Sequence, residues 1–166
     1  MNWITITGSS NGIGAALAEV FARNGYSIIL HGRNVSDLSG MEKKIGSYGV
    51  ESVVVNGDMR EQRTLDTLIQ KSKEKNIVLL VNNVGYRCPG KAVEDLTDVQ
   101  IDEMFALNCT IPIKLTREIY RHFLQRSDGG SIMNINFIRG LEPKGNRSIY
   151  AASRFAMRGF SESLRQ

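Results

Sequence analysis

Three short stretches of this chain carry residues whose types and spacing could do chemistry. They are the glycine-bearing turn from Thr7 to Gly14, the sequence Asn82-Asn83-Val84-Gly85, and the pair Tyr150 and Arg154. Glycines between a strand and a helix bring a phosphate close to backbone N–H donors and to the positive end of a helix dipole. The turn therefore indicates a phosphate site, although a tight strand-to-helix turn that binds no ligand has a similar composition and stays an alternative.

The elements around these turns must bring them together for such a site to exist. The first turn follows an apolar run at residues 3–7, and the second follows another at residues 77–81. In an open parallel sheet, ligands bind at the carboxyl ends of the strands, where the strand order reverses. We therefore expect the two turns to face each other across a nucleotide site.

The whole chain alternates short apolar runs with helical stretches, which is typical of βαβ units. This alternation predicts a doubly wound, Rossmann-type parallel sheet in three α/β/α layers, as a single dinucleotide-binding domain over residues 1–166. Gly25 is expected to end the first helix, and Ser36 to cap the second. The predicted strands are 3–7, 27–30, 50–55, 77–81 and 131–136, and the predicted helices are 12–24, 37–47, 61–75, 98–125 and 148–166.

Composition excludes several classes of function. The net charge of +4 is scattered rather than gathered into a basic face, so we expect no nucleic-acid partner. No apolar run approaches the ~20 residues that span a bilayer, so we expect no membrane partner. Cys88 and Cys109 fit free thiols in a reducing cytoplasm, and neither they nor the isolated His31 and His122 have the spacing of a metal site.

Four motifs, in order, make the chain similar to the short-chain dehydrogenase/reductases over essentially its whole length. The family's TGxxxGxG turn matches Thr7 to Gly14, and its NNAG motif matches Asn82 to Gly85 with Val in place of Ala. Its adenine-contacting aspartate matches Asp58, and its helical catalytic asparagine matches Asn108. The resemblance implies an oxidoreductase that passes a hydride between a nicotinamide cofactor and a carbonyl or alcohol substrate. The cofactor-binding residues expected in this chain are Gly8, Ser10, Asn11, Gly12, Ile13, Gly14, Arg33, Asp58, Asn83 and Gly85.

The end of the second strand bears on which cofactor is bound. NAD sites use an acid there to bind the ribose 2′-hydroxyl, whereas NADP sites use a nearby arginine. Here no acid occurs before Asp37, and Arg33 can offer a planar fork to a 2′-phosphate. The sequence favours NADP(H) over NAD(H). The alternative is that Arg33 merely lies in an exposed turn and binds no phosphate.

The expected catalytic residues are Tyr150, Arg154 and Asn108, but they depart from the family's pattern. The family has lysine where this chain has Arg154, and serine thirteen residues before the tyrosine, where this chain has Phe137. A phenol has a pKa of about 10, so its use near neutrality needs a cation, which Arg154 supplies without being able to relay a proton. The serine's hydrogen bond to the reacting carbonyl is lost, at a typical cost of ~10²–10³ in turnover.

Two hypotheses about activity follow from these departures. Asn134 and Asn136 are expected to point away from the face of Phe137 if the strand persists that far, and Ser148 could stand in for the missing serine. One hypothesis is an oxidoreductase with Tyr150 as the acid or base. The other is a catalytically silent nucleotide-binding or interaction module, with Phe137 filling the pocket.

The end of the chain lies within a helix and lacks a capping glycine or proline. Members of the family continue with further strands and helices that close the substrate pocket, so we expect an incomplete domain whose fifth strand lies at the sheet edge. An exposed edge favours association. The family's dimer face uses the helices expected around 98–125 and 148–166, so we expect a homo-oligomer. Tyr86, Arg87 and Cys88 could line the remaining pocket or be plain loop residues.

Overall fold

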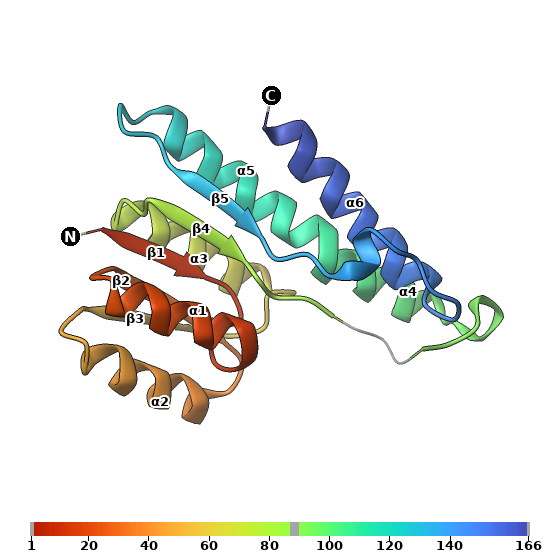
Figure 1. Cartoon of the computed structure of the whole chain (residues 1–166), viewed down its shortest axis with the longest axis horizontal. Coiled ribbons are helices and arrows are strands. Elements are labelled where there is room, and N and C mark those ends of the chain that lie inside the picture. The colour runs from red at the N-terminus through yellow and green to blue at the C-terminus, as the bar shows by residue number, and fades with distance from the viewer. Residues whose placement is uncertain (1, 87–89, 166) are drawn as a thin grey trace. The chain divides into compact units, whose positions relative to one another are not determined.

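The computed structural model of the chain describes residues 2–86 and 90–165 (Figure 1). They form two compact units: residues 1–83 with 115–133, and residues 84–114 with 134–166. The predicted alternation of strands and helices is confirmed. In chain order the elements are β1 (Trp3–Ile6), α1 (Gly12–Arg23), β2 (Ser27–Gly32), α2 (Val35–Gly46), β3 (Ser52–Asn56), α3 (Gln62–Glu74), β4 (Leu79–Asn82), the 3₁₀ turn η1 (Val93–Asp95), α4 (Asp98–Phe105), the π-helical turn η2 (Ala106–Thr110), α5 (Ile111–Leu124), β5 (Ser131–Asn134), the 3₁₀ turn η3 (Ile138–Gly140) and α6 (Ser148–Leu164).

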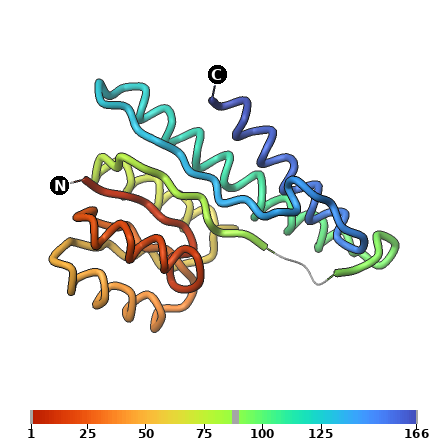
Figure 2. The backbone as a smooth tube through the Cα atoms, viewed as in Figure 1, coloured from red at the N-terminus to blue at the C-terminus, as the bar shows by residue number. Residues whose placement is uncertain are grey.

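The first unit is built on a parallel sheet whose strand order is β3-β2-β1-β4-β5. The chain moves outward from β1 to β2 and β3 and then returns through α3 to β4, so the order reverses between β1 and β4 (Figure 2). Ile4 on β1 pairs with Ile28 of β2 on one side and with Leu79 of β4 on the other. Every residue of β1 and β2 is buried, as expected for strands covered on both faces.

Helices cover both faces of this sheet and complete the predicted three-layer architecture. α1 and α2 pack against one another on one face, and α3 lies on the other (Figure 1). Lys73 of α3 and Glu118 of α5 form an ion pair, with 3.4 Å between Nζ and Oε2, which places α5 beside α3. The two faces follow from right-handed crossovers that run in opposite directions from β1.

α1 approaches the sheet closely because its buried residues are small. They are Gly14, Ala18 and Ala22. The helix ends at Asn24, and Gly25 follows with a φ of +82°, a left-handed conformation that glycine adopts without a Cβ clash. The predicted capping role of Gly25 is confirmed.

The start of α2 differs from the prediction. Asn34, not Ser36, is the N-cap, and its Oδ1 accepts hydrogen bonds from the backbone N–H groups of Ser36 (2.9 Å) and Asp37 (3.2 Å). Both residue types make good caps, and sequence alone did not decide which of the two would take the extended conformation that a cap needs.

The second unit contains α4, η2 and α6. α4 begins with a capping box, in which the Thr97 side chain accepts from the Gln100 N–H and the Gln100 side chain accepts from the Thr97 N–H. The predicted helical stretch over about 98–125 is confirmed in extent, since α4, η2 and α5 follow one another without a break. Within it, residues 106–110 form a π-helical turn in which the Ile111 N–H donates to the Ala106 carbonyl. Pro112 follows this turn and has no N–H to donate to the carbonyl four residues earlier.

β5 also differs from the prediction, since it ends at Asn134 rather than at residue 136. It lies at the edge of the sheet, as predicted, and Ser131 and Met133 on it are exposed. The strand alternation expected to direct Asn136 and Phe137 therefore does not reach them. Of the helices described, none is both long and apolar enough to cross a lipid bilayer.

Candidate active site

The glycine turn of the first unit is shaped by backbone conformation. Gly8 and Gly12 have φ values of +66° and +56°, which side-chain-bearing residues rarely adopt. A Cβ on Gly14 would overlap the Gly8 carbonyl and lie 2.6 Å from Asn83 Nδ2. Two of these glycines therefore provide left-handed turns, and the third provides the close contact between the turn and α1.

The N-terminus of α1 has no side-chain cap among the residues that the structure describes. Asn11 is its N-cap, but the Asn11 side chain makes no capping hydrogen bond. Asn11, Gly12 and Ile13 are exposed, and Ser10 is half-buried against Gly32. Unpaired N–H groups at the positive end of a helix are the donors that a pyrophosphate needs, so this cradle fits a dinucleotide.

Asn83 joins the two turns. Its side-chain amide donates to the carbonyls of Thr7 and Gly8, both at 3.0 Å, and its backbone N–H donates to Thr7 Oγ1 at 2.8 Å. The neighbouring Asn82 is buried and donates to Thr116 Oγ1 at 2.9 Å. The expected meeting of the two turns is thus confirmed at Asn83, whose side chain holds the glycine turn in place.

A charged group lies at the ends of β2 and β3. The Asp58 carboxylate accepts from the Arg60 side chain, from Nε at 3.1 Å and from Nη2 at 2.7 Å. Hydrogen bonding to Arg60 lowers the pKa of Asp58 to about 2. Arg33 Nη1 lies 3.9 Å from Asp58 Oδ2, and the Arg33 side chain is 77% exposed. Arg33 is therefore accessible to a ligand.

His31 also contacts the glycine turn of the first unit, although its spacing in the sequence is isolated. It is buried at the end of β2, where Nδ1 accepts from the Gly8 N–H at 3.1 Å and Nε2 lies 3.2 Å from the Gly57 carbonyl. These partners require Nδ1 to be unprotonated and Nε2 to carry the hydrogen. Burial lowers the pKa of His31 to about 4, so the ring is neutral near pH 7. The sequence could have indicated this role, because His31 lies two residues before Arg33, at the strand end where the cofactor is expected.

The second unit holds Tyr150 and Arg154 on one face of α6. Both are buried, and the Arg154 guanidinium carbon lies 5.2 Å from the centre of the Tyr150 ring. Arg154 Nε is buried and has no hydrogen-bond partner among the residues that the structure describes. A Cβ on Gly85 would overlap Arg154 Nη2, so this glycine leaves room for the larger arginine. The arrangement places a buried cation against the phenol ring.

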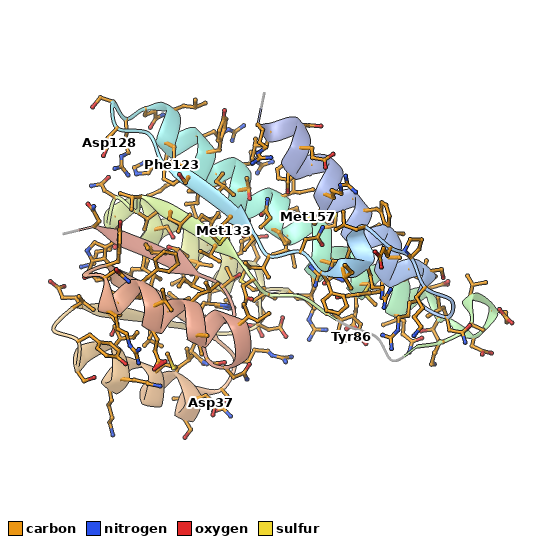
Figure 3. All side chains as sticks on the ribbon, in the orientation of Figure 1. Asp37, Tyr86, Phe123, Asp128, Met133 and Met157 are labelled. Carbon is orange, nitrogen blue, oxygen red and sulfur yellow. The ribbon has the colours of Figure 1, made fainter. Side chains whose placement is uncertain are left out.

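Asn108 holds the loop that leads to Tyr86. Its Oδ1 accepts from the Tyr86 N–H at 2.6 Å, and its Nδ2 donates to the Tyr86 carbonyl at 2.9 Å and to Ser153 Oγ at 3.0 Å. The Tyr86 side chain packs against the cluster of Met104 and Tyr150. Figure 3 shows Tyr86 on the segment of chain that follows β4. Tyr86 thus lies beside the candidate catalytic tyrosine, whereas Arg87 and Cys88 fall outside the described residues.

The position of the family's serine carries no hydroxyl. Phe137 is 46% exposed, and its ring centre lies 6.0 Å from that of Tyr150. The Asn136 side chain donates to the Arg154 carbonyl at 3.0 Å, so it is engaged elsewhere. Ser148 lines a small pocket together with Tyr150, whereas Asn134 and Asn136 are not among the residues that line it. Ser148 is therefore the best placed of these three to replace the family's serine.

Comparison with known proteins shows the family of the chain. The family model described as short chain dehydrogenase matches residues 2–166, and the chain belongs to that family. It is 34% identical to a very-long-chain 3-oxoacyl-CoA reductase of Anas platyrhynchos, covering 98% of this chain and 53% of the relative. The chain thus spans about half the length of that relative.

Solved structures show the same fold. A short-chain dehydrogenase from Sphingobium yanoikuyae in complex with NADPH matches with a TM-score of 0.91 and 30% identity, over 99% of this chain and 65% of that one. A metagenomic short-chain oxidoreductase in complex with NADP matches with a TM-score of 0.91 and 25% identity, over 98% of this chain and 74% of that one. The Rossmann-type fold and the oxidoreductase family are therefore established for this chain.

Proposed function

We propose that this chain is an NADP(H)-dependent oxidoreductase that acts on a small carbonyl or alcohol compound. The observation that carries the proposal is the buried Tyr150 ring against the Arg154 guanidinium, in a chain that also has a glycine cradle suited to a dinucleotide. The nicotinamide would supply or accept the hydride. Each remaining part of the reaction falls to side chains of this chain.

Tyr150 would donate a proton to the carbonyl oxygen, or take one from the alcohol. The Arg154 guanidinium would place a positive charge beside the phenol ring, 5.2 Å from its centre. Asn108 would act as a positioning residue through its two bonds to the Tyr86 backbone. Arg154 cannot give up its own proton, so proton supply would have to reach Tyr150 from water or from the substrate hydroxyl.

NADP(H) is proposed over NAD(H) because of Arg33. The side chain is exposed at the end of β2, and the nearest acid after it along the chain is Asp37, within α2. A planar guanidinium can donate two hydrogen bonds to a 2′-phosphate. The NADPH- and NADP-bound relatives lend support from the family.

The second candidate function is a catalytically silent nucleotide-binding module. It is favoured by Phe137, because no hydroxyl stands there to stabilise charge on a reacting carbonyl oxygen. Such a protein would bind the cofactor without consuming it.

Calorimetric titration of the chain with NADPH, and with NADH in parallel, tests the cofactor. We expect saturable binding that is tighter for NADPH and that loses this preference in Arg33→Ala. Equal binding of the two cofactors would refute the NADP(H) assignment. NADPH consumption over a panel of carbonyl compounds then tests the reaction, and consumption that survives in full in Tyr150→Phe would exclude Tyr150 as the acid.

We also propose that the chain forms a homodimer through the helices around 98–125 and 148–166. Val99, Leu124 and Phe155 on these helices are exposed apolar residues, which favours burial against a second copy. Light scattering tests this, and a monomer at high concentration would refute it. A cytoplasmic location is part of the proposal, because a free thiol such as that of Cys109 persists in a reducing compartment.

A further inference from the structure

Arg60 and Asp58 form an ion pair just after β3. Asp58 Oδ1 accepts from both the backbone N–H (2.9 Å) and Nε (3.1 Å) of Arg60, and Oδ2 accepts from Nη2 (2.7 Å). This is a bidentate guanidinium–carboxylate pair, the strongest hydrogen-bonding geometry available to these groups. Its consequence is that the guanidinium charge of Arg60 lies directly on the Asp58 carboxylate.

Arg33 approaches the same carboxylate from β2. Gly32 pairs with Asn56 in the sheet, so the chain leaves β2 and β3 at neighbouring points. Arg33 Nη1 lies 3.9 Å from Asp58 Oδ2, too far for a hydrogen bond, and no other ion pair of Arg33 occurs among the described residues. An anion bound by Arg33 would therefore lie close to the negative charge of Asp58.

That closeness creates an electrostatic conflict for a 2′-phosphate. The phosphate carries more than one negative charge near pH 7. At short range it is repelled by the Asp58 carboxylate, whose side chain is 19% exposed, so that water screens the pair incompletely. The conflict is absent for a 2′-hydroxyl. Without compensation, Asp58 would weaken binding of the phosphorylated dinucleotide selectively.

We propose that Arg60 is a specificity-determining residue that favours NADP(H) by neutralising Asp58 beside the phosphate-binding Arg33. The group Arg33–Asp58–Arg60 then carries one net positive charge, and Arg60 acts through Asp58 rather than on the ligand. The low pKa of Asp58 is consistent with this coupling, because it is held down chiefly by the hydrogen bond from Arg60. This inference rests on the cofactor assigned in the proposed function.

Titration calorimetry of the full chain at neutral pH tests the proposal through one quantity, the ratio of the NADH dissociation constant to the NADPH dissociation constant. Contacts to the adenine affect both dinucleotides equally and cancel in this ratio. Arg60→Ala should lower the ratio about tenfold, with NADH affinity changed less than about twofold. The matched control is Arg63→Ala, which removes the same charge from an exposed site in the first turn of α3 and should leave the ratio within about twofold.

The double variant Arg60→Ala with Asp58→Asn separates the two ways in which Arg60 could act. If Arg60 neutralises Asp58, removing the carboxylate charge restores the ratio to within about threefold of the parent chain. A ratio that stays low in the double variant would mean that Arg60 contacts the phosphate directly, and would overturn the proposal. Arg60→Gln provides a second neutral variant, and thermal unfolding checks that each variant is folded.

The outcomes also distinguish this inference from the proposed function. A ratio that depends on Arg33 but not on Arg60 overturns the inference and leaves the NADP(H) assignment intact. Equal loss of NADPH and NADH affinity in Arg60→Ala overturns it as well, because that result shows a structural role. A parent chain that binds neither dinucleotide overturns both.

Discussion

The two units of this chain keep the family's motifs in different ways. In the first unit the Thr7–Gly14 turn retains each glycine of the pattern, and His31 and Asn83 hold it through bonds to its backbone. In the second unit Tyr150 is retained, but Phe137 and Arg154 occupy the positions of the family's serine and lysine. The phosphate cradle is made mostly of backbone, so it depends on a few glycines. The proton-transfer group depends on individual side chains, so one substitution changes its chemistry while the fold persists.

Restoring the family's side chains in the second unit should have the largest effect. Phe137→Ser combined with Arg154→Lys is expected to raise turnover of NADPH by ~10²–10³, because the serine returns a hydrogen-bond donor to the reacting oxygen. Leu141→Ser is the control, since it removes another exposed apolar side chain of the same unit and should leave the turnover unchanged. If the parent chain already consumes NADPH as fast as the restored variant, the side chains at positions 137 and 154 do not limit catalysis, and the contrast between the units does not extend to activity.

Acid should act on the first unit through His31. Its folded pKa of about 4 lies below the value of about 6.5 expected when unfolded, so the unfolded chain binds the proton more readily. The contribution of His31 to the free energy of unfolding is therefore fully present above about pH 6.5. It falls by roughly 3 kcal/mol as the pH drops to about 4. Denaturant unfolding across this range measures the loss, and His31→Gln should flatten it relative to His122→Gln. The second unit contains no histidine. An unchanged pH profile in His31→Gln would contradict the prediction.

One glycine from each unit compares the two kinds of site directly. Gly14→Ala is expected to cost about 1–3 kcal/mol of stability and to weaken NADPH binding, because the new methyl group meets the fixed Gly8 carbonyl. Gly85→Ala should cost less, since it meets the end of the flexible Arg154 side chain. Thermal unfolding with Gly40→Ala as control, where a Cβ meets nothing within 4 Å, tests the order. Equal losses at Gly14 and Gly85 would show that Arg154 is as rigid as the backbone.

The smallest expected effect concerns the N-cap of α2, the first-unit helix that begins just after Arg33. Asn34→Ala should lower the free energy of unfolding by about 1 kcal/mol, because two backbone N–H groups lose their acceptor. Ser36→Ala should be nearly neutral. A larger effect at Ser36 than at Asn34 would restore the capping residue expected from the sequence.

Much of the fold could be predicted because its signals are local. Strands and helices are marked by apolar runs and by residues such as Gly25, whose role depends only on backbone conformation. Boundaries were less predictable: β5 stops at Asn134, and the π-helical turn around Asn108 was missed although Pro112 gave a local warning. A proline four residues after the aligned asparagine removes a helical donor, and that signal can be used in other chains.

The candidate site shows the same division. The residue types of the site could be read from the sequence. They are the three glycines of the turn, Arg33, Tyr150, and Phe137 and Arg154 in place of the family's serine and lysine. Their partners depend on the folded chain, as the contact of His31 with the Gly8 N–H and the approach of Arg33 to Asp58 show. Glycine positions follow from local φ preferences, whereas ion pairs and buried hydrogen bonds depend on how separate strand ends and loops are placed in space. For that reason the cradle could be predicted from its motif, and the charge balance beside it could not.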